Sequence, residues 1–172
     1  VNCPGNVTDN LAKRIRTFVE HGGYLLTTDW ALDGCLESAC PGYAYWDGAN
    51  SSSAIVDAVA VQPSNRLFEH AVHFAPWKLD DKSQLVKISQ SKPIDVLVRS
   101  RLLSREDPSG LGILACTFPF GHGHVLHLVG HFDNNTNLAF QSALPDPAPH
   151  IKIGLRQALA LNFLIESLAL KK

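Results

Sequence analysis

A helix that ends in two glycines and leads into a buried strand constrains the fold of this chain more than any other segment. Residues 8–21 carry apolar side chains at helical spacing, and Thr8 or Asp9 stands where an N-cap residue is needed. Residues 24–28, Tyr-Leu-Leu-Thr-Thr, follow the glycine pair and form an apolar run too short for a second helix. A helix, a tight stop and a buried strand in this order predict a βαβ unit of a parallel sheet.

Further strands are predicted in the middle and late parts of the chain. Residues 54–61 and residues 95–100 are short runs rich in β-branched and apolar side chains. Residues 112–118 and residues 123–129 are two such runs joined by a turn at 119–122, which contains Pro and Gly. These last two runs predict an antiparallel hairpin.

Two more helices and one loop complete the predicted elements. A short helix is expected over residues 31–37, before the Pro-Gly pair at 41–42. Leu, Ile and Ala dominate residues 151–172, which predict a C-terminal helix packed on a sheet. Residues 43–53 are rich in Gly, Ser and aromatic side chains and predict a surface loop.

The composition permits one hydrophobic core without disulfide or metal staples. The chain has 172 residues, of which 45% are hydrophobic and 18% are charged. Its 15 Lys and Arg balance 16 Asp and Glu, so no basic block marks a nucleic-acid partner, and no apolar run is long enough for a membrane span. We therefore expect a single α/β domain over residues 1–172, with neither nucleic acid nor a membrane as partner.

The cysteines point to a reducing compartment. All four are irregularly spaced, and none forms the C-x-x-C pair that is typical of zinc and redox sites. The first residues lack the basic and apolar regions of a signal peptide. Three Asn-x-Ser/Thr matches, at Asn6, Asn50 and Asn134, matter only in a secreted protein. We expect a cytoplasmic protein with free thiols.

Short motifs stand along the chain in a fixed order: Cys3-Pro4-Gly5, residues 18–23, residues 25–30, residues 121–125 and residues 130–133. In this order they resemble the class I glutamine amidotransferase-like superfamily, and within it the ThuA-like branch. The resemblance implies a three-layer, flavodoxin-like, mostly parallel sheet with a late antiparallel hairpin and a C-terminal helix. We expect a small-molecule ligand and no cofactor.

The resemblance also implies an unusual residue at the active position. In this superfamily a Cys nucleophile stands on a sharp turn between a strand and a helix, and a His-x-Glu pair follows a late strand. Such a turn lifts the nucleophile clear of the sheet and aims the helix N-terminus at developing negative charge. Here the turn holds Asp29, while His131 and Asp133 match the late pair, with the acid placed to orient the imidazole. Asp29, His131 and Asp133 are therefore the candidate catalytic residues of a domain without the Cys nucleophile.

The leading hypothesis is a non-catalytic or divergent amidotransferase-like domain that binds a small ligand or serves as an interaction module. Cys3, Pro4, Gly5 and Trp30 are the candidate ligand-binding residues, because open α/β sheets bind ligands at the carboxyl ends of their strands. A structural alternative makes Asp29 a helix N-cap and uses Trp30 to pack that helix on the sheet.

Two alternatives of other classes remain open. One is a hydrolase in which His131 acts as a base or metal ligand, assisted by Asp29 and Asp133. We assign no metal, but His127 and His131 are the candidate ligands, because alternate residues of an extended strand share a face. The other is a scaffold built around the C-terminal helix, which predicts an exposed apolar stripe on residues 151–170.

The resemblance also implies a place in the fold for the first residues of the chain. Residues 1–3 match the end of an inner strand, so we expect one or two βα units to precede them. A sheet that lacks those units exposes an edge. Copies of the chain would then pair through this edge into a homo-oligomer.

Overall fold

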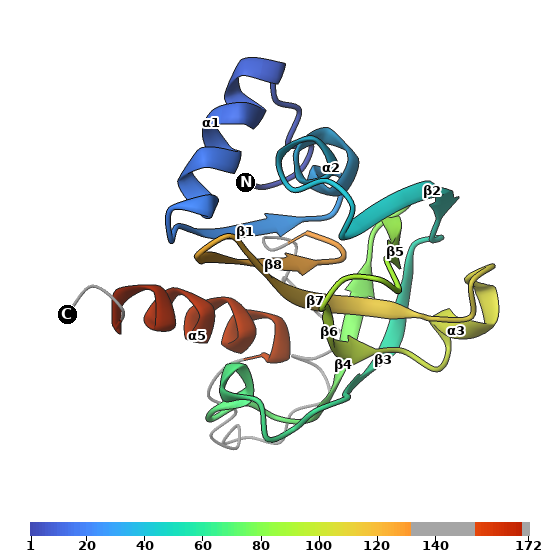
Figure 1. Ribbon diagram of the computed structural model, residues 1–172. Coiled ribbons are helices and arrows are strands. Elements are labelled where there is room, and N and C mark those ends of the chain that lie inside the picture. The colour runs from blue at the N-terminus through green and yellow to red at the C-terminus, as the bar shows by residue number, and fades with distance from the viewer. Residues whose placement is uncertain (132–153, 170–172) are drawn as a thin grey trace.

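A curled sheet of six strands and a smaller sheet of two strands form the centre of the computed structural model, which describes residues 1–131 and 154–169 (Figure 1). The order in the large sheet is β1-β8-β7-β6-β3-β4, and β2 pairs with β5 in the small one. The strands are β1 (Tyr24–Thr28), β2 (Ala44–Asn50), β3 (Ala54–Ala60), β4 (Phe74–Leu79), β5 (Gln84–Ile88), β6 (Asp95–Arg99), β7 (Ile113–Phe120) and β8 (Gly123–Leu128).

The prediction of a mostly parallel sheet is wrong. Among the described strands β1 and β8 form a parallel pair, with Tyr24 opposite His124 and Thr28 opposite Leu128, whereas the other pairs are antiparallel. A parallel connection needs a crossover of a dozen or more residues, usually a helix. Between β3 and β7 the chain forms only very short helices, so neighbouring strands there reverse direction.

Helices cover both faces of the β1 and β8 pair, so the predicted three layers exist at this end of the sheet (Figure 1). α1 and the short helices after β1 lie on one side, and α5 lies on the other. The helices are α1 (Asp9–Glu20), the π-helix η1 (Leu32–Leu36), α2 (Glu37–Ala39), the 3-10 helix η2 (Arg66–Phe68), α3 (Leu103–Glu106) and α5 (Leu155–Ala169).

The local predictions for the first helix and the late hairpin are confirmed. Thr8 caps α1 by accepting the N–H of Leu11, and β7 and β8 pair across a two-residue turn. That turn packs on the end of α1, where the N–H of His122 donates to the carbonyl of Glu20. A Cβ on Gly123 would lie 2.1 Å from the carbonyl oxygen of Gly23, so only glycine permits this approach.

Three strands lie where no strand was expected from the residue pattern. β2 occupies most of the predicted loop 43–53, and β4 and β5 fall in a stretch without a clear alternating pattern. β4 contains Pro76 and forms the edge of the large sheet, where a residue without an N–H is tolerated. A proline inside a short apolar run argues against a strand prediction there. In the folded protein it also removes one backbone N–H donor from the exposed edge.

The buried face of α5 is anchored by one arginine. The Arg156 guanidinium stacks on the ring of Trp77, 4.3 Å from its centroid, and donates to the backbone carbonyls of Lys78, at 2.6 Å, and of His131. Trp77 in turn donates its indole N–H to the carbonyl of Val129 at 2.9 Å. These bonds tie α5 to β4 and to the segment that follows β8.

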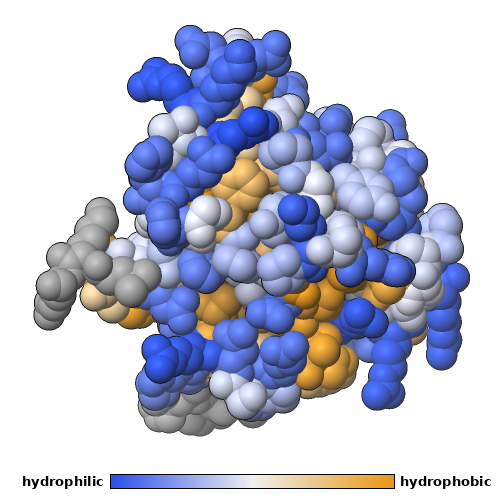
Figure 2. All heavy atoms as spheres, viewed as in Figure 1, coloured by the Kyte–Doolittle hydropathy of each residue, from blue (hydrophilic) through white to orange (hydrophobic). Residues whose placement is uncertain are grey.

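The outer face of α5 carries the apolar stripe that the scaffold hypothesis predicts. Its exposed members follow helical spacing: Leu161, Leu164, Ile165 and Leu168. Figure 2 shows more apolar surface over the region of β3 and β4, where Ile55 and Phe74 are exposed. In the described ranges, no helix has the length and apolar character that a membrane crossing requires.

A buried histidine makes the stability of this fold depend on pH. His127 of β8 is fully buried, and its Nδ1 shares a hydrogen bond of 2.9 Å with the hydroxyl of Thr27. Burial lowers the pKa of His127 to about 3, from an unfolded value of about 6.5. Below about pH 6.5 the unfolded chain therefore binds a proton that the native state excludes. We predict that His127 lowers the free energy of unfolding by about 1.4 kcal/mol per pH unit as pH falls toward 4.

Urea unfolding of the wild type and of His127→Gln across this pH range measures the effect. Gln keeps a hydrogen-bonding group near Thr27 but does not titrate, so the difference between the two proteins should shrink as pH falls. His122→Gln, at an exposed position, serves as the control and should follow the wild-type slope. Parallel curves for the wild type and His127→Gln would contradict the prediction.

Loss of the arginine that anchors α5 should destabilise the fold. Arg156→Met retains much of the side-chain volume but leaves the carbonyls of Lys78 and His131 without their donor. We expect a loss of about 3 kcal/mol in the free energy of unfolding, because unsatisfied buried groups and a lost charged hydrogen bond add together. Arg14→Met on the exposed face of α1 is the matched control and should change stability by less than about 0.5 kcal/mol.

Candidate functional site

A sharp turn at Asp29 ends β1 and begins the helical segment after it. The N–H of Asp29 still donates to the carbonyl of Leu128 on β8, at 2.9 Å, while its own carbonyl accepts the N–H of Leu32 at 2.9 Å. Between these two bonds the backbone of Asp29 takes a φ of +46°, which non-glycine residues rarely adopt but Asp tolerates better than most. A strand, a residue at positive φ and a helix form the elbow geometry expected at this position.

The carboxyl group of Asp29 is almost completely enclosed. Only 1% of the side chain is exposed, and Oδ1 accepts the backbone N–H of Gln84 at 3.3 Å. Oδ2 is buried and accepts no hydrogen bond from the residues that the structure describes. Burial raises the pKa of Asp29, and the charge of His131 and the nearby Ser83 hydroxyl oppose that rise. The turn thus presents a buried acceptor that lacks a donor.

His131 lies beside this free oxygen, although it is far from Asp29 in sequence. Its Nδ1 lies 3.5 Å from Oδ2 of Asp29 and only 2.6 Å from Oδ2 of Asp80. Asp80 follows β4 and is also within 3.4 Å of the backbone N–H of His131. Burial raises the pKa of Asp80, but the hydrogen bonds from His131 outweigh it and hold that pKa below its ordinary value. Asp80 therefore fixes the orientation of the imidazole.

Cys3 completes the group. Its sulfur, a carboxylate oxygen of Asp29 and a ring nitrogen of His131 all lie within 4.8 Å of one another. The backbone N–H of Cys3 donates to the hydroxyl of Thr28 at 3.4 Å, which holds the segment against β1. Burial raises the pKa of the Cys3 thiol, against the opposing effect of the Trp30 backbone N–H. We call Cys3, Asp29, Asp80 and His131 the elbow cluster.

The other predicted ligand-binding residues surround the elbow. Gly5 approaches the turn so closely that a Cβ there would lie 2.5 Å from the Cβ of Ala31. Pro4 lies beside Gly34 of η1 in the same way. Trp30 is 40% exposed and donates its indole N–H to the carbonyl of Lys82 at 2.7 Å, which ties the elbow to the turn before β5. The role of these residues in binding stays a prediction.

The structure separates His127 from His131. The prediction placed both on one face of an extended strand, but β8 ends at Leu128 and Gly130 has a φ of +81°, which breaks the alternation. His127 instead lies in the core against Thr27. In the described ranges the metal-capable group is Cys3, Asp29 and His131, without His127. Asp133, the predicted partner of His131, lies outside the described residues.

Sequence reasoning missed Asp80 as the partner of His131. The residue stands in a charged turn, Asp80-Asp81-Lys82, between two strands that the pattern did not predict. The only signal was this run of charges between apolar stretches. Arg156 was also missed as the donor that holds the backbone of His131, because it looked like an interruption of an apolar helix.

No model of a known protein family matches the sequence, and no curated protein does. Solved structures do resemble the fold. A cytoplasmic protein of Salmonella typhimurium has a TM-score of 0.60 at 13% identity, over 92% of this chain and 61% of that one. A putative ThuA-like protein from Bacteroides uniformis has a TM-score of 0.58 at 14% identity, over 91% and 63% of the two chains.

A third similar structure belongs to a much larger enzyme. A β-galactosidase from Rahnella sp. has a TM-score of 0.54 at 17% identity, over 87% of this chain but only 24% of that one. The chain therefore spans less than two thirds of each of these three proteins. At such low identities the comparisons show the fold alone, and this fold is shared with a ThuA-like protein.

Proposed function

We propose that this chain is a divergent amidotransferase-like domain of the ThuA-like branch that binds a small polar ligand at the elbow cluster. The observation that carries the proposal is the carboxyl group of Asp29 on the elbow turn. One of its buried oxygens has no hydrogen-bond donor among the residues that the structure describes and lies 3.5 Å from Nδ1 of His131. A buried acceptor without a donor is unfavourable, so a ligand that donates a hydrogen bond there gains affinity.

Thiol-dependent glutamine hydrolysis is disfavoured by the same residue. A carboxylate at the elbow cannot form the thioester intermediate that a Cys nucleophile forms. The nearby thiol of Cys3 is not activated, because burial raises its pKa and so favours the neutral form. Both observations favour binding over amide hydrolysis at this position.

The surroundings of the cluster suit a hydroxylated or amino-bearing ligand. Asp29 offers an acceptor, His131 is 31% exposed beside it, and the ring of Trp30 is exposed at the next position along the chain. Aromatic rings and carboxylates together are common contacts for such molecules. A β-galactosidase is among the similar structures, so galactosides are the first class to test.

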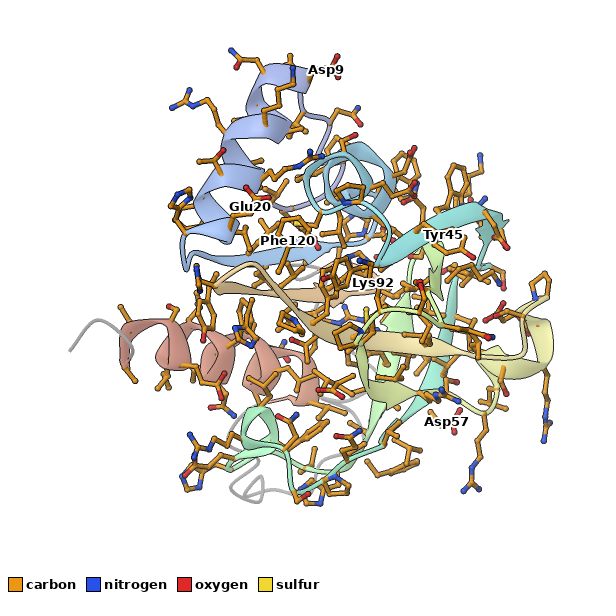
Figure 3. All side chains as sticks on the ribbon, in the orientation of Figure 1. Asp9, Glu20, Tyr45, Asp57, Lys92 and Phe120 are labelled. Carbon is orange, nitrogen blue, oxygen red and sulfur yellow. The ribbon has the colours of Figure 1, made fainter. Side chains whose placement is uncertain are left out.

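We predict that Asp29→Asn weakens the binding of such a ligand at least tenfold. Asn keeps the shape of the side chain and tolerates positive φ, but it removes the negative charge from the acceptor. Calorimetry and thermal shift with galactose, lactose and glutamine, all in the presence of EDTA, measure the effect. The matched control is Asp9→Asn, because Asp9 lies at the exposed tip of α1 (Figure 3) and should not alter affinity.

Two results would count against the proposal. One is glutamine hydrolysis by the wild type that is lost in Cys3→Ser. The other is a bound ligand whose affinity is the same for the wild type and Asp29→Asn.

The second candidate function is hydrolysis with His131 as general base. The observation that favours it is the 2.6 Å contact between Nδ1 of His131 and Asp80, because a carboxylate on one ring nitrogen orients the imidazole for proton transfer at the other. A turnover of an amide, ester or glycoside substrate that Asp80→Asn lowers in kcat more than in KM would support it. Absence of turnover across these classes would exclude it.

A further inference from the structure

We infer that Cys3, Asp29 and His131 form a binding site for a divalent transition-metal ion, with Zn²⁺ as the best match to the three donors. The inference goes beyond the proposed function, because it assigns a metal ion to the same cluster whether or not an organic ligand binds there. Its three donors are a sulfur, a carboxylate oxygen and an imidazole nitrogen, which come from three separate segments of the chain.

The donor atoms lie at separations that suit one small cation. One donor atom from each of the three side chains lies within 4.8 Å of the other two. Two donors at ordinary zinc distances around a tetrahedral ion are roughly 3.3 Å apart. Side-chain rotations that shorten these separations would therefore bring the three atoms around one ion.

The hydrogen bonding of Asp29 supports the same site independently. Oδ2 of Asp29 belongs to a side chain that is 1% exposed, and it lacks a hydrogen-bond partner in the described residues. A buried carboxylate oxygen without a donor is rare in folded proteins and is costly unless a cation or proton satisfies it. A metal ion on this oxygen would remove that cost.

The chemistry of the donors selects the metal. Thiolate and imidazole favour Zn²⁺ and its transition-metal neighbours over Mg²⁺ and Ca²⁺, which prefer oxygen ligands. Three protein ligands would leave a fourth position for water or a ligand, and the His131 side chain, 31% exposed, puts the cluster in contact with solvent. Because Asp80 bonds Nδ1 of His131, Nε2 is the ring nitrogen that would bind the ion, and Asp80 would act as the carboxylate that supports a ligating histidine, as outer-shell carboxylates commonly do.

The cluster is held in place by backbone contacts that do not involve its donor atoms. The N–H of Cys3 is bonded to Thr28, and the N–H of Asp29 is bonded to Leu128 on β8. The carbonyl of His131 accepts from Arg156. These contacts fix the three segments before any ion binds, so little ordering is required on binding.

The test uses the tag-free full chain after removal of metal by a chelator. We expect Zn²⁺ titration by calorimetry to show one equivalent bound, and Co²⁺ to give a thiolate-to-cobalt charge-transfer band. Cys3→Ser should abolish that band, and Cys3→Ser, Asp29→Asn and His131→Gln should each lower Zn²⁺ affinity at least tenfold. Cys116→Ala, at a buried thiol, and His122→Gln, at an exposed imidazole, are the controls and should retain wild-type binding.

Circular dichroism and thermal midpoints show which variants are folded. If Cys3→Ser or Asp29→Asn fails to fold, His131→Gln, at a partly exposed side chain, carries the test. Absence of stoichiometric Zn²⁺ binding overturns the inference, as does binding that all three cluster variants retain. Ligand binding in EDTA without any Zn²⁺ binding would overturn this inference and leave the proposed function standing. Zn²⁺ binding without an organic ligand would support the inference and count against the proposed function.

Discussion

The parallel pairing of β1 with β8 is the contact on which the elbow cluster depends. It brings the carboxyl end of an early strand next to the carboxyl end of a late one, so that Asp29 and the residues after Leu128 meet at the same end of the paired strands. The bond from the N–H of Asp29 to Leu128 continues the pairing into the turn itself. Without this register the positive φ of Asp29 would be a local irregularity, and its carboxyl group would not face His131.

Two charged residues then convert this proximity into a defined geometry. The carboxylate of Asp80 contacts both Nδ1 and the backbone N–H of His131. Arg156 donates to the backbone carbonyl of His131. Arg156 also stacks on Trp77, so the position of His131 is coupled to the docking of α5. A substitution far from the cluster, in α5 or β4, is therefore expected to move His131.

Local sequence patterns were sufficient for the elements that form from neighbouring residues. The cap at Thr8, the hairpin of β7 and β8 and the position of Asp29 on a strand-to-helix turn follow from short-range rules. The directions of the strands could not be predicted from such local patterns. One βαβ unit near the start of the chain suggested a parallel sheet, but it says nothing about how the later strands pair. Asp80 could not be predicted as the partner of His131, because the two residues are 51 positions apart in the sequence. The strand before Asp80, β4, was also not predicted, because it contains Pro76. Long-range partners of this kind leave no periodic signal.

The carboxyl group of Asp29, which faces inward on a turn at positive φ, is the feature on which the proposed site depends most. A crystal structure of the full chain at high resolution measures this directly. It should show Asp29 at positive φ, with Oδ2 directed between Cys3 and His131 and with density for an ion or ligand atom on that oxygen after soaking. Asp29 turned to solvent, or Oδ2 satisfied by a donor from the protein itself, would contradict the account.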